Sequence, residues 1–148
     1  MPLDLEAIYV DLHRHPELSF QETRTAGVIA RALAELGLDV EEGVGKTGVV
    51  ATIVNPSTSS GTGGPVVWLR ADMDALPVRE DTGLEYASIA RGTDPAGTDV
   101  PVMHACGHDM HVTALLGALE RLVATKDEWS GTVVAVFQPA EEYGAGSQ

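Results

Sequence analysis

VTALLGALERLVATKDEWSGTVVAVFQ, residues 112–138, passes from a helical pattern directly into a strand pattern. Its first half repeats apolar residues at the spacing of one helix face, and these are Val112, Leu115, Leu116, Leu119, Leu122 and Val123. We therefore predict a half-buried helix that begins at or just after Asp109 and ends near Lys126. GTVVAVFQ (131–138) is a continuous apolar run, typical of a buried strand, and Pro139 ends it.

Two further helices are predicted upstream of this stretch. Apolar residues recur near helical spacing within residues 3–15, and Pro16 closes that segment. TRTAGVIARALAELG (23–37) has a second apolar face and a glycine placed to end it. Ser19 and Glu22 stand three residues apart ahead of this second helix, which is the spacing of a capping box.

Two β-rich runs follow these helices. GVVATIV (48–54) and PVVWLRADM (65–73) are joined by the polar linker NPSTSSGTGG (55–64), so we predict an antiparallel hairpin. Residues 77–103 contain repeated glycines and prolines with little periodicity, which predicts a long irregular connection with at most short strands. Helices that alternate with strands predict an α/β fold, a mixed sheet covered by helices.

The composition favours a folded cytoplasmic protein that avoids nucleic acid and membranes. The chain has 148 residues, 44% of them hydrophobic, and its mean hydropathy is +0.04. Its 9 Lys and Arg against 22 Asp and Glu give a net charge of -13, which repels a nucleic-acid backbone or an anionic membrane. A single cysteine points to a reducing compartment, and no leader or membrane-spanning pattern is recognisable, so we expect a cytoplasmic location.

GVGKTG (43–48) ends like a phosphate-binding loop, but its context does not fit one. Val40 stands where the first glycine of that motif would have to be, and the VVATIV that follows has a strand pattern. A phosphate loop needs the N-terminus of a helix at that point, because its amide groups bind the phosphate. We therefore interpret the segment as a glycine turn that leads into a strand.

Residues that carry chemistry gather in three short clusters. HACGHDMH (104–111) places three histidines, an aspartate and the only cysteine at the mouth of the predicted helix. RADMD (70–74) and QPAEE (138–142) each end a predicted strand with two carboxylates. Asp72 and Asp74 lie on the same side of their strand if it stays extended. Because sites in open α/β sheets lie at the carboxyl ends of the strands, we expect the clusters to border one crevice.

A divalent metal explains these clusters together, because so many carboxylates would repel one another without a cation. The thiolate of Cys106 and the imidazole of His108 suit zinc and its neighbours, whereas the carboxylates would also accept manganese. Glu141 and Glu142 are adjacent, and we expect their side chains to point in divergent directions. One of them can then bind the ion while the other takes and returns a proton.

Each residue also has an ordinary structural explanation, which the sequence leaves open. Cys106 can be a small buried hydrophobic residue. Asp109 can be the N-cap of the helix, with His104 and His111 as hydrogen-bonding partners at the helix end. The two glutamates of QPAEE can be a solvated strand end.

Three motifs in register resemble the amidohydrolase branch of the aminoacylase and carboxypeptidase family of dinuclear metallopeptidases. These are RADMDALP (70–77), MHACGHDMH (103–111) and FQPAEE (137–142), and HRHPELSFQE (13–22) is similar to the N-terminal HxxPEL segment of the family. Members include hippurate hydrolases, N-acyl-amino-acid amidohydrolases and auxin-conjugate hydrolases. The resemblance covers nearly the whole chain and implies the N-terminal part of a zinc-peptidase-like catalytic domain.

The resemblance implies roles for five residues. Cys106 is similar to the thiolate that lies between two metal ions, and His108 and Glu142 are similar to metal ligands. Glu141 resembles the general base and acid, and Asp74 resembles the carboxylate that orients a ligand. The implied reaction is hydrolysis of an amide bond in an N-acyl amino acid or small peptide, with two divalent ions, Zn²⁺ or Mn²⁺.

Family members continue with further histidine ligands and an inserted lid and dimerisation domain. We therefore expect residues 1–148 to be an incomplete catalytic domain with an open sheet edge, from a parent that is a homodimer or larger. The alternative is that the 148-residue chain is an inactive fragment that binds metal weakly or mediates association.

Overall fold

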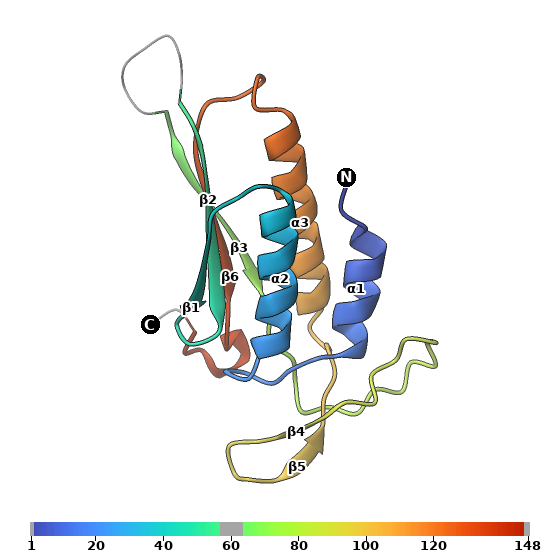
Figure 1. Ribbon diagram of the computed structural model, residues 1–148. Helices are drawn as coiled ribbons and strands as arrows, with labels where there is room; N and C mark the ends of the chain where they lie inside the picture. The colour runs from blue at the N-terminus through green and yellow to red at the C-terminus, as the bar shows by residue number, and fades with distance from the viewer. Residues whose placement is uncertain (1, 57–63, 147–148) are drawn as a thin grey trace.

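In the computed structural model, which describes residues 2–56 and 64–146, three α-helices lie on one face of a four-stranded sheet (Figure 1). The predicted α/β fold with a mixed sheet is confirmed. The elements in chain order are α1 (Leu5–Arg14), α2 (Thr23–Glu35), β1 (Val40–Val44), β2 (Gly48–Asn55), β3 (Val66–Asp72), β4 (Arg91–Thr93), β5 (Asp99–Pro101), α3 (His108–Ala124), β6 (Gly131–Gln138) and the short 3₁₀ helix η1 (Glu141–Tyr143).

The strand order is β1-β2-β6-β3, so the last strand among the described residues lies inside the sheet. β6 pairs with β2 antiparallel and with β3 parallel. The predicted hairpin of residues 48–54 and 65–73 is therefore wrong, because β6 lies between the two strands. β6 is the most apolar run and buries Val133, Ala135 and Phe137, so an inner position removes more apolar surface from water. Residues 57–63 of the linker, for which the sequence predicts a turn, lie outside the described residues.

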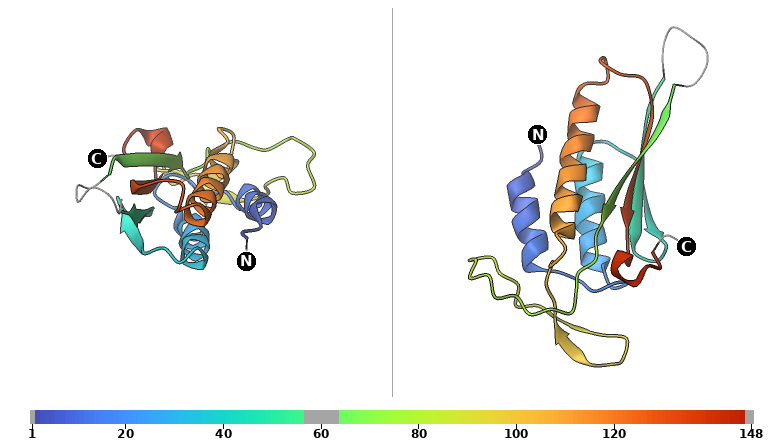
Figure 2. Two further views of the ribbon diagram at one scale, coloured as in Figure 1. Left: turned by 90° about the horizontal axis from the view of Figure 1, so that it is seen from above. Right: turned by 180° about the vertical axis from the view of Figure 1, so that it is seen from behind.

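The three predicted helices are confirmed, and their order across the layer is visible in Figure 2. α2 covers β1 and β2, α3 covers β3 and β6, and α1 packs on the outer side of α3. Gly37 follows α2 with φ +74°, a conformation that favours glycine, and so ends the helix as expected. The predicted capping box is wrong, because the N-cap residue Glu22 makes no side-chain capping bond and both Ser19 and Glu22 bond to residues elsewhere in the chain.

The core lies between the helices and the sheet. Its largest fully buried apolar side chains come from every layer and are Leu12, Ile29, Leu33, Ile53, Met73, Leu116, Leu119 and Phe137. The opposite face of the sheet carries exposed apolar side chains, with Trp68 at 69% and Val54 at 63% exposure. The expected open edge is found on both sides of the described sheet, at β1 and β3.

Residues 77–103 form the predicted irregular connection, and the short ladder of β4 and β5 is the only regular structure within that segment. Main-chain bonds between Leu76 and Met103 close the base of this loop. The sequence did not predict β1, whose residues VEEGV lack an alternating apolar pattern and are mostly exposed. Within the described ranges, no helix combines the length and apolar character needed to span a membrane.

Candidate metal centre

The three clusters meet at the carboxyl ends of β3 and β6. The two strands run parallel and end side by side, with Asp72 paired to Gln138. Beyond the ladder, the main-chain nitrogen of Met73 donates a hydrogen bond to the oxygen of Gln138 at 3.2 Å. The first turn of α3 begins at His108 beside β3, so the helix mouth lies at the same edge. The predicted convergence of the three clusters is confirmed.

His108 is buried at 4% exposure, and its ring is held in one tautomer. Its Nδ1 lies 2.9 Å from the main-chain oxygen of Asp74 and 3.2 Å from Oδ1 of the same residue. A carbonyl oxygen only accepts hydrogen bonds, so Nδ1 must carry the proton. In the neutral ring, Nε2 therefore has a free lone pair, which is the state that binds a metal ion.

Asp74 is 1% exposed and bonds to several other residues of the site. Its Oδ2 accepts hydrogen bonds from Oγ of Ser19 at 2.6 Å and from the main-chain nitrogen of Glu142 at 3.0 Å. Burial raises the pKa of Asp74, but the bonds from His108, Ser19 and Glu142 outweigh it and hold that pKa below its ordinary value. Burial lowers the pKa of His108, whereas the bonds to Asp74 raise it by more. A charged carboxylate thus holds the ring and the glutamate segment together.

Glu141 and Glu142 both approach the free nitrogen of His108. Their nearest carboxylate oxygens lie 3.8 Å and 3.9 Å from Nε2, and the three side chains form a group of possible metal ligands. The expectation that the two glutamates diverge is wrong, because Ala140 has φ +50° and the 3₁₀ turn that follows brings both carboxylates to one side. These separations are too long for direct hydrogen bonds. A lone pair facing two carboxylates fits a divalent cation between them.

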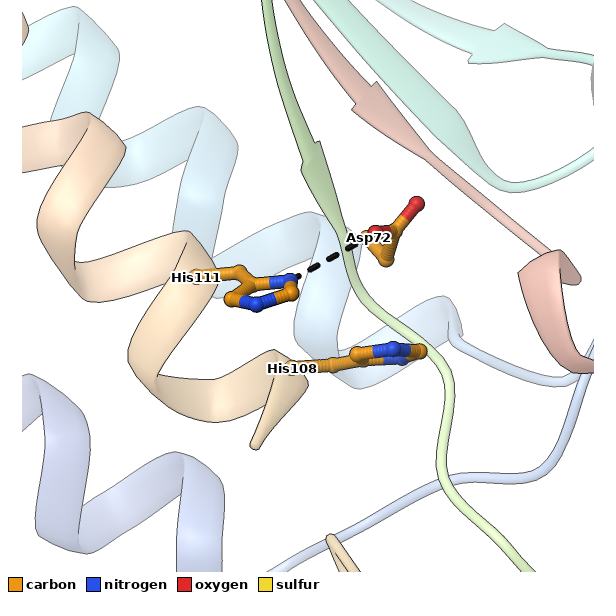
Figure 3. Close-up of side chains that lie close together, drawn as sticks. All are labelled: Asp72, His108 and His111. Carbon is orange, nitrogen blue, oxygen red and sulfur yellow. Dashed lines mark ion pairs between the residues drawn. The ribbon is translucent and has the colours of Figure 1, made fainter. Parts of the chain in front are cut away.

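A second group of possible ligands consists of Asp72, His108 and His111 (Figure 3). Nδ1 of His111 lies 3.4 Å from Oδ2 of Asp72, and the His111 ring stacks on the His108 ring with centroids 5.2 Å apart. Asp72 is also paired with Arg70 at 2.9 Å, which weakens it as a metal ligand. Because His108 has only one free nitrogen, this group and the group with the glutamates compete for it.

Reasoning from the sequence assigned no role to Asp72 and His111. The signal that could have found His111 is its position three residues after His108 in a helix, which places both rings on one face.

Cys106 is exposed and belongs to neither group of the described residues. A hydrogen bond to the carboxylate of Glu142, together with a small effect of burial and of nearby carboxylates, raises the pKa of its thiol. The thiol therefore lies near the glutamate segment. Its role as a ligand stays a prediction, and the alternative that Cys106 is a buried hydrophobic residue is wrong.

Two buried histidines lie next to the site. Oδ2 of Asp109 bonds to Nδ1 of His13 at 2.6 Å, and Nε2 of His13 reaches Glu80 at 3.1 Å. Asp109 lies in the first turn of α3, and the N-cap is Gly107. His104 is 5% exposed and has no hydrogen-bond partner among the described residues, and burial lowers its pKa to about 4. His104 is thus a neutral ring at pH 7.

The comparisons with known proteins agree with the motifs. Residues 68–148 match the family described as peptidase family M20/M25/M40. The chain is 48% identical over 133 residues to thermostable carboxypeptidase 1 of Saccharolobus solfataricus, which covers 90% of this chain and 30% of that protein. It is 46% identical over 136 residues to N-acetyl-L-cysteine deacetylase of Bacillus subtilis, covering 92% of this chain and 29% of that protein.

The fold agrees with a solved structure as well. The crystal structure of the Bacillus subtilis YxeP protein, described as a dinuclear metal binding peptidase from the M20 family, superposes with a TM-score of 0.82. Sequence identity is 42%, and the match covers 97% of this chain and 36% of that chain. The chain spans about 30% of the length of the curated relatives, 30% for the carboxypeptidase and 29% for the deacetylase.

Proposed function

The chain belongs to peptidase family M20/M25/M40, and from that membership we propose that the complete gene product hydrolyses amide bonds in N-acyl amino acids or small peptides with divalent metal ions. The relatives are named as a carboxypeptidase and a deacetylase, both of which cleave an amide bond next to an amino acid. The YxeP protein is described as a dinuclear metal binding peptidase, which supports two ions in the complete site.

The observation that carries this proposal is the state of the His108 ring. Asp74 holds the proton on Nδ1, and the free Nε2 faces two carboxylates at 3.8 Å and 3.9 Å. A histidine that served only to pack or to hydrogen-bond would not need its lone pair directed at two acids. We assign His108, Glu142 and Cys106 as metal ligands and Asp74 as the residue that orients His108.

The two glutamates differ in a way that supports separate roles. The Glu142 side chain is 19% exposed, and its main-chain nitrogen is fixed by Asp74, which suits a ligand. The Glu141 side chain is 39% exposed, so it can reach a water molecule and the substrate. We assign Glu141 as the general base that takes a proton from the attacking water and gives it to the departing amine. Bound divalent ions would supply Lewis acidity toward the scissile carbonyl.

The finer points of the proposal rest on composition and on the donor set. Sulfur and imidazole favour Zn²⁺, whereas the carboxylates would also accept Mn²⁺. A small-molecule substrate is proposed from the family resemblance. The net charge of -13 opposes a nucleic-acid or anionic membrane partner, and the single cysteine supports a cytoplasmic location. A homodimeric or larger parent is proposed from the family resemblance.

A second candidate concerns the 148-residue chain taken alone. Trp68, Val54 and Val66 leave an apolar sheet face exposed at 69%, 63% and 60%, which favours association. We propose as the alternative that the 148-residue chain by itself is catalytically inactive and binds metal weakly or mediates association. Normal turnover by the purified 148-residue chain, with monomers in light scattering, would rule this candidate out.

The test of the main proposal uses the complete gene product loaded with Zn²⁺ or Mn²⁺. Its hydrolysis of hippurate, N-acetyl amino acids and dipeptides is followed by release of the free amino acid. We expect turnover of at least one of these classes, and loss of turnover after metal removal by a chelator. Full activity in both Glu141→Gln and Cys106→Ala would contradict the assignment.

A further inference from the structure

Three non-glycine residues of the described chain have positive φ, and three separate segments supply them. They are Phe20 (φ 62°) before α2, Lys46 (φ 92°) in the β1–β2 turn and Ala140 (φ 50°) between β6 and η1. Positive φ disfavours side chains with a Cβ, and such strain persists only where the surroundings hold it. All three segments meet at one junction, directly before Glu141.

A buried carboxylate connects the three segments. Glu22 is 0% exposed, and its two oxygens serve different partners. Oε2 accepts a hydrogen bond from Oγ1 of Thr47 at 2.5 Å, and Oε1 accepts one from the main-chain nitrogen of Ala140 at 2.9 Å. Lys46 lies beside Thr47, and its Nζ is 4.2 Å from the centroid of the Phe20 ring, two residues before Glu22.

The turn GVGKTG is shaped to fit this junction. A Cβ added to Gly48 would lie 2.9 Å from Cδ of Pro139 and 2.4 Å from the main-chain oxygen of Val44, so only glycine lets the turn come this close. The segment that resembles a phosphate loop in sequence thus packs against Pro139, one residue before Ala140. Its threonine hydroxyl is used to hold Glu22.

We propose that Glu22, held by Thr47, is a positioning residue that sets the place of Glu141 and Glu142. This inference rests on the proposed function, since it concerns the same site. The 3₁₀ segment is fixed at two points, by Glu22 at the nitrogen of Ala140 and by Asp74 at the nitrogen of Glu142. Glu141 lies between these anchors. If the first anchor is lost, Ala140 is free to leave its positive φ, and both carboxylates then move relative to His108.

The test removes the anchor while keeping the side-chain shape. In the complete gene product, Glu22→Met leaves the nitrogen of Ala140 without its acceptor, whereas Glu22→Gln still offers one oxygen to Ala140 and an amide group to Thr47. Glu17→Met is the matched control. Like Glu22, Glu17 has a carboxylate that accepts hydrogen bonds near the start of α2, but its three bonds all come from Arg24 and Thr25.

The readouts are the dissociation constant for Zn²⁺, measured by titration, and kcat and KM for the best substrate. For Glu22→Met we expect the zinc dissociation constant to rise about 10- to 100-fold, as for other residues that support metal ligands. We expect kcat to fall about 10- to 100-fold with a smaller change in KM, because misplaced reacting groups affect the chemical step. Glu22→Gln should restore both, and Glu17→Met should resemble the wild type.

Wild-type zinc affinity and kcat in Glu22→Met would overturn the inference, as would an equal loss in Glu17→Met. If Glu22→Met does not fold, the zinc affinities of Thr47→Val and Thr47→Ser are compared instead, because only the serine keeps the hydroxyl that holds Glu22. Equal zinc affinity in these two variants would then overturn it. Absence of hydrolysis by the wild type would count against the proposed function alone, since the zinc titration still reads the position of Glu142.

Discussion

The main-chain oxygen of Asp74 accepts the hydrogen bond of His108 Nδ1 at 2.9 Å, across 34 residues of sequence. The end of a strand thereby decides which nitrogen of a helix residue is free. The carboxylate of the same residue accepts hydrogen bonds from Ser19 and from the main-chain nitrogen of Glu142, so Asp74 sets the tautomer of the imidazole through its main chain and the place of the glutamate segment through its side chain. Substitutions can test each part of this arrangement separately.

Loss of the Asp74 carboxylate should weaken metal binding. In Asp74→Asn the side chain can no longer accept all the bonds from His108, Ser19 and Glu142, so the zinc dissociation constant should rise about 10- to 100-fold. Zinc titration of the complete gene product measures it. Asp99→Asn is the control, because the exposed Asp99 side chain pairs with Arg91 and belongs to neither group of possible metal ligands. An equal loss in both variants would show that the orienting role is not specific to Asp74.

Substitution of the two glutamates should separate chemistry from metal binding. Glu141→Gln removes the proposed base, so kcat should fall about 10²- to 10⁴-fold while zinc affinity stays near that of the wild type. Glu142→Gln removes a proposed ligand, so zinc affinity should fall as well. Steady-state kinetics and zinc titration on both variants check this split. The reverse pattern would exchange the two assignments.

Cys106 should contribute sulfur to the metal. The complete gene product loaded with Co²⁺ should show a thiolate-to-metal charge-transfer band, and Cys106→Ser should abolish that band while keeping the fold. The absorption spectrum and the circular dichroism of both proteins measure these two properties. A band of unchanged strength in the serine variant would remove Cys106 from the ligand set.

The free energy of unfolding should depend on pH through His13, which lies between the carboxylates of Glu80 and Asp109. Burial lowers the pKa of His13, but hydrogen bonds to Glu80 and Asp109 outweigh it, so the folded-state pKa lies above the ordinary value of 6.5. The protonated His13 ring therefore stabilises the folded state. This contribution to the free energy of unfolding is complete below about pH 6.5 and is lost as the pH rises through the folded-state pKa of His13. Tyr9 and Tyr86 also pack against this ring, so its other neighbours are aromatic.

Urea unfolding between pH 5 and 9 measures this effect. His13→Gln should cost about 1–3 kcal/mol at pH 6 and less at pH 9, because it leaves buried acceptors without their partner. His15→Gln is the control, since the His15 side chain is 46% exposed. A loss in His13→Gln that is the same at both pH values would contradict the prediction.

The fold was predictable from sequence where local pattern decides it. Helical spacing located α3 to within two residues at each end, and the apolar run located β6. The pairing of residues 48–54 with residues 65–73 was wrong, because a strand that begins only at Gly131 lies between them. The residue pattern of the two β-rich runs does not indicate a partner strand, such as β6, that is distant in sequence.

The candidate site was predictable as a set of residue types, but its geometry was not. The motifs indicated His108, Glu141 and Glu142, which the structure brings together. The orientation of both glutamates depends on the positive φ of Ala140, and Ser19 and Glu22 serve tertiary partners instead of the helix cap that their spacing suggests. Such choices are made by tertiary hydrogen bonds, which a local pattern does not encode.

The most direct test of the metal centre is anomalous diffraction at the zinc edge from crystals of the complete gene product. We predict an ion about 2.0–2.1 Å from Nε2 of His108, with a carboxylate oxygen of Glu142 also bound and Nδ1 still directed at Asp74. An ion bound through Nδ1, or zinc bound elsewhere with the His108 ring free, would contradict the assignment.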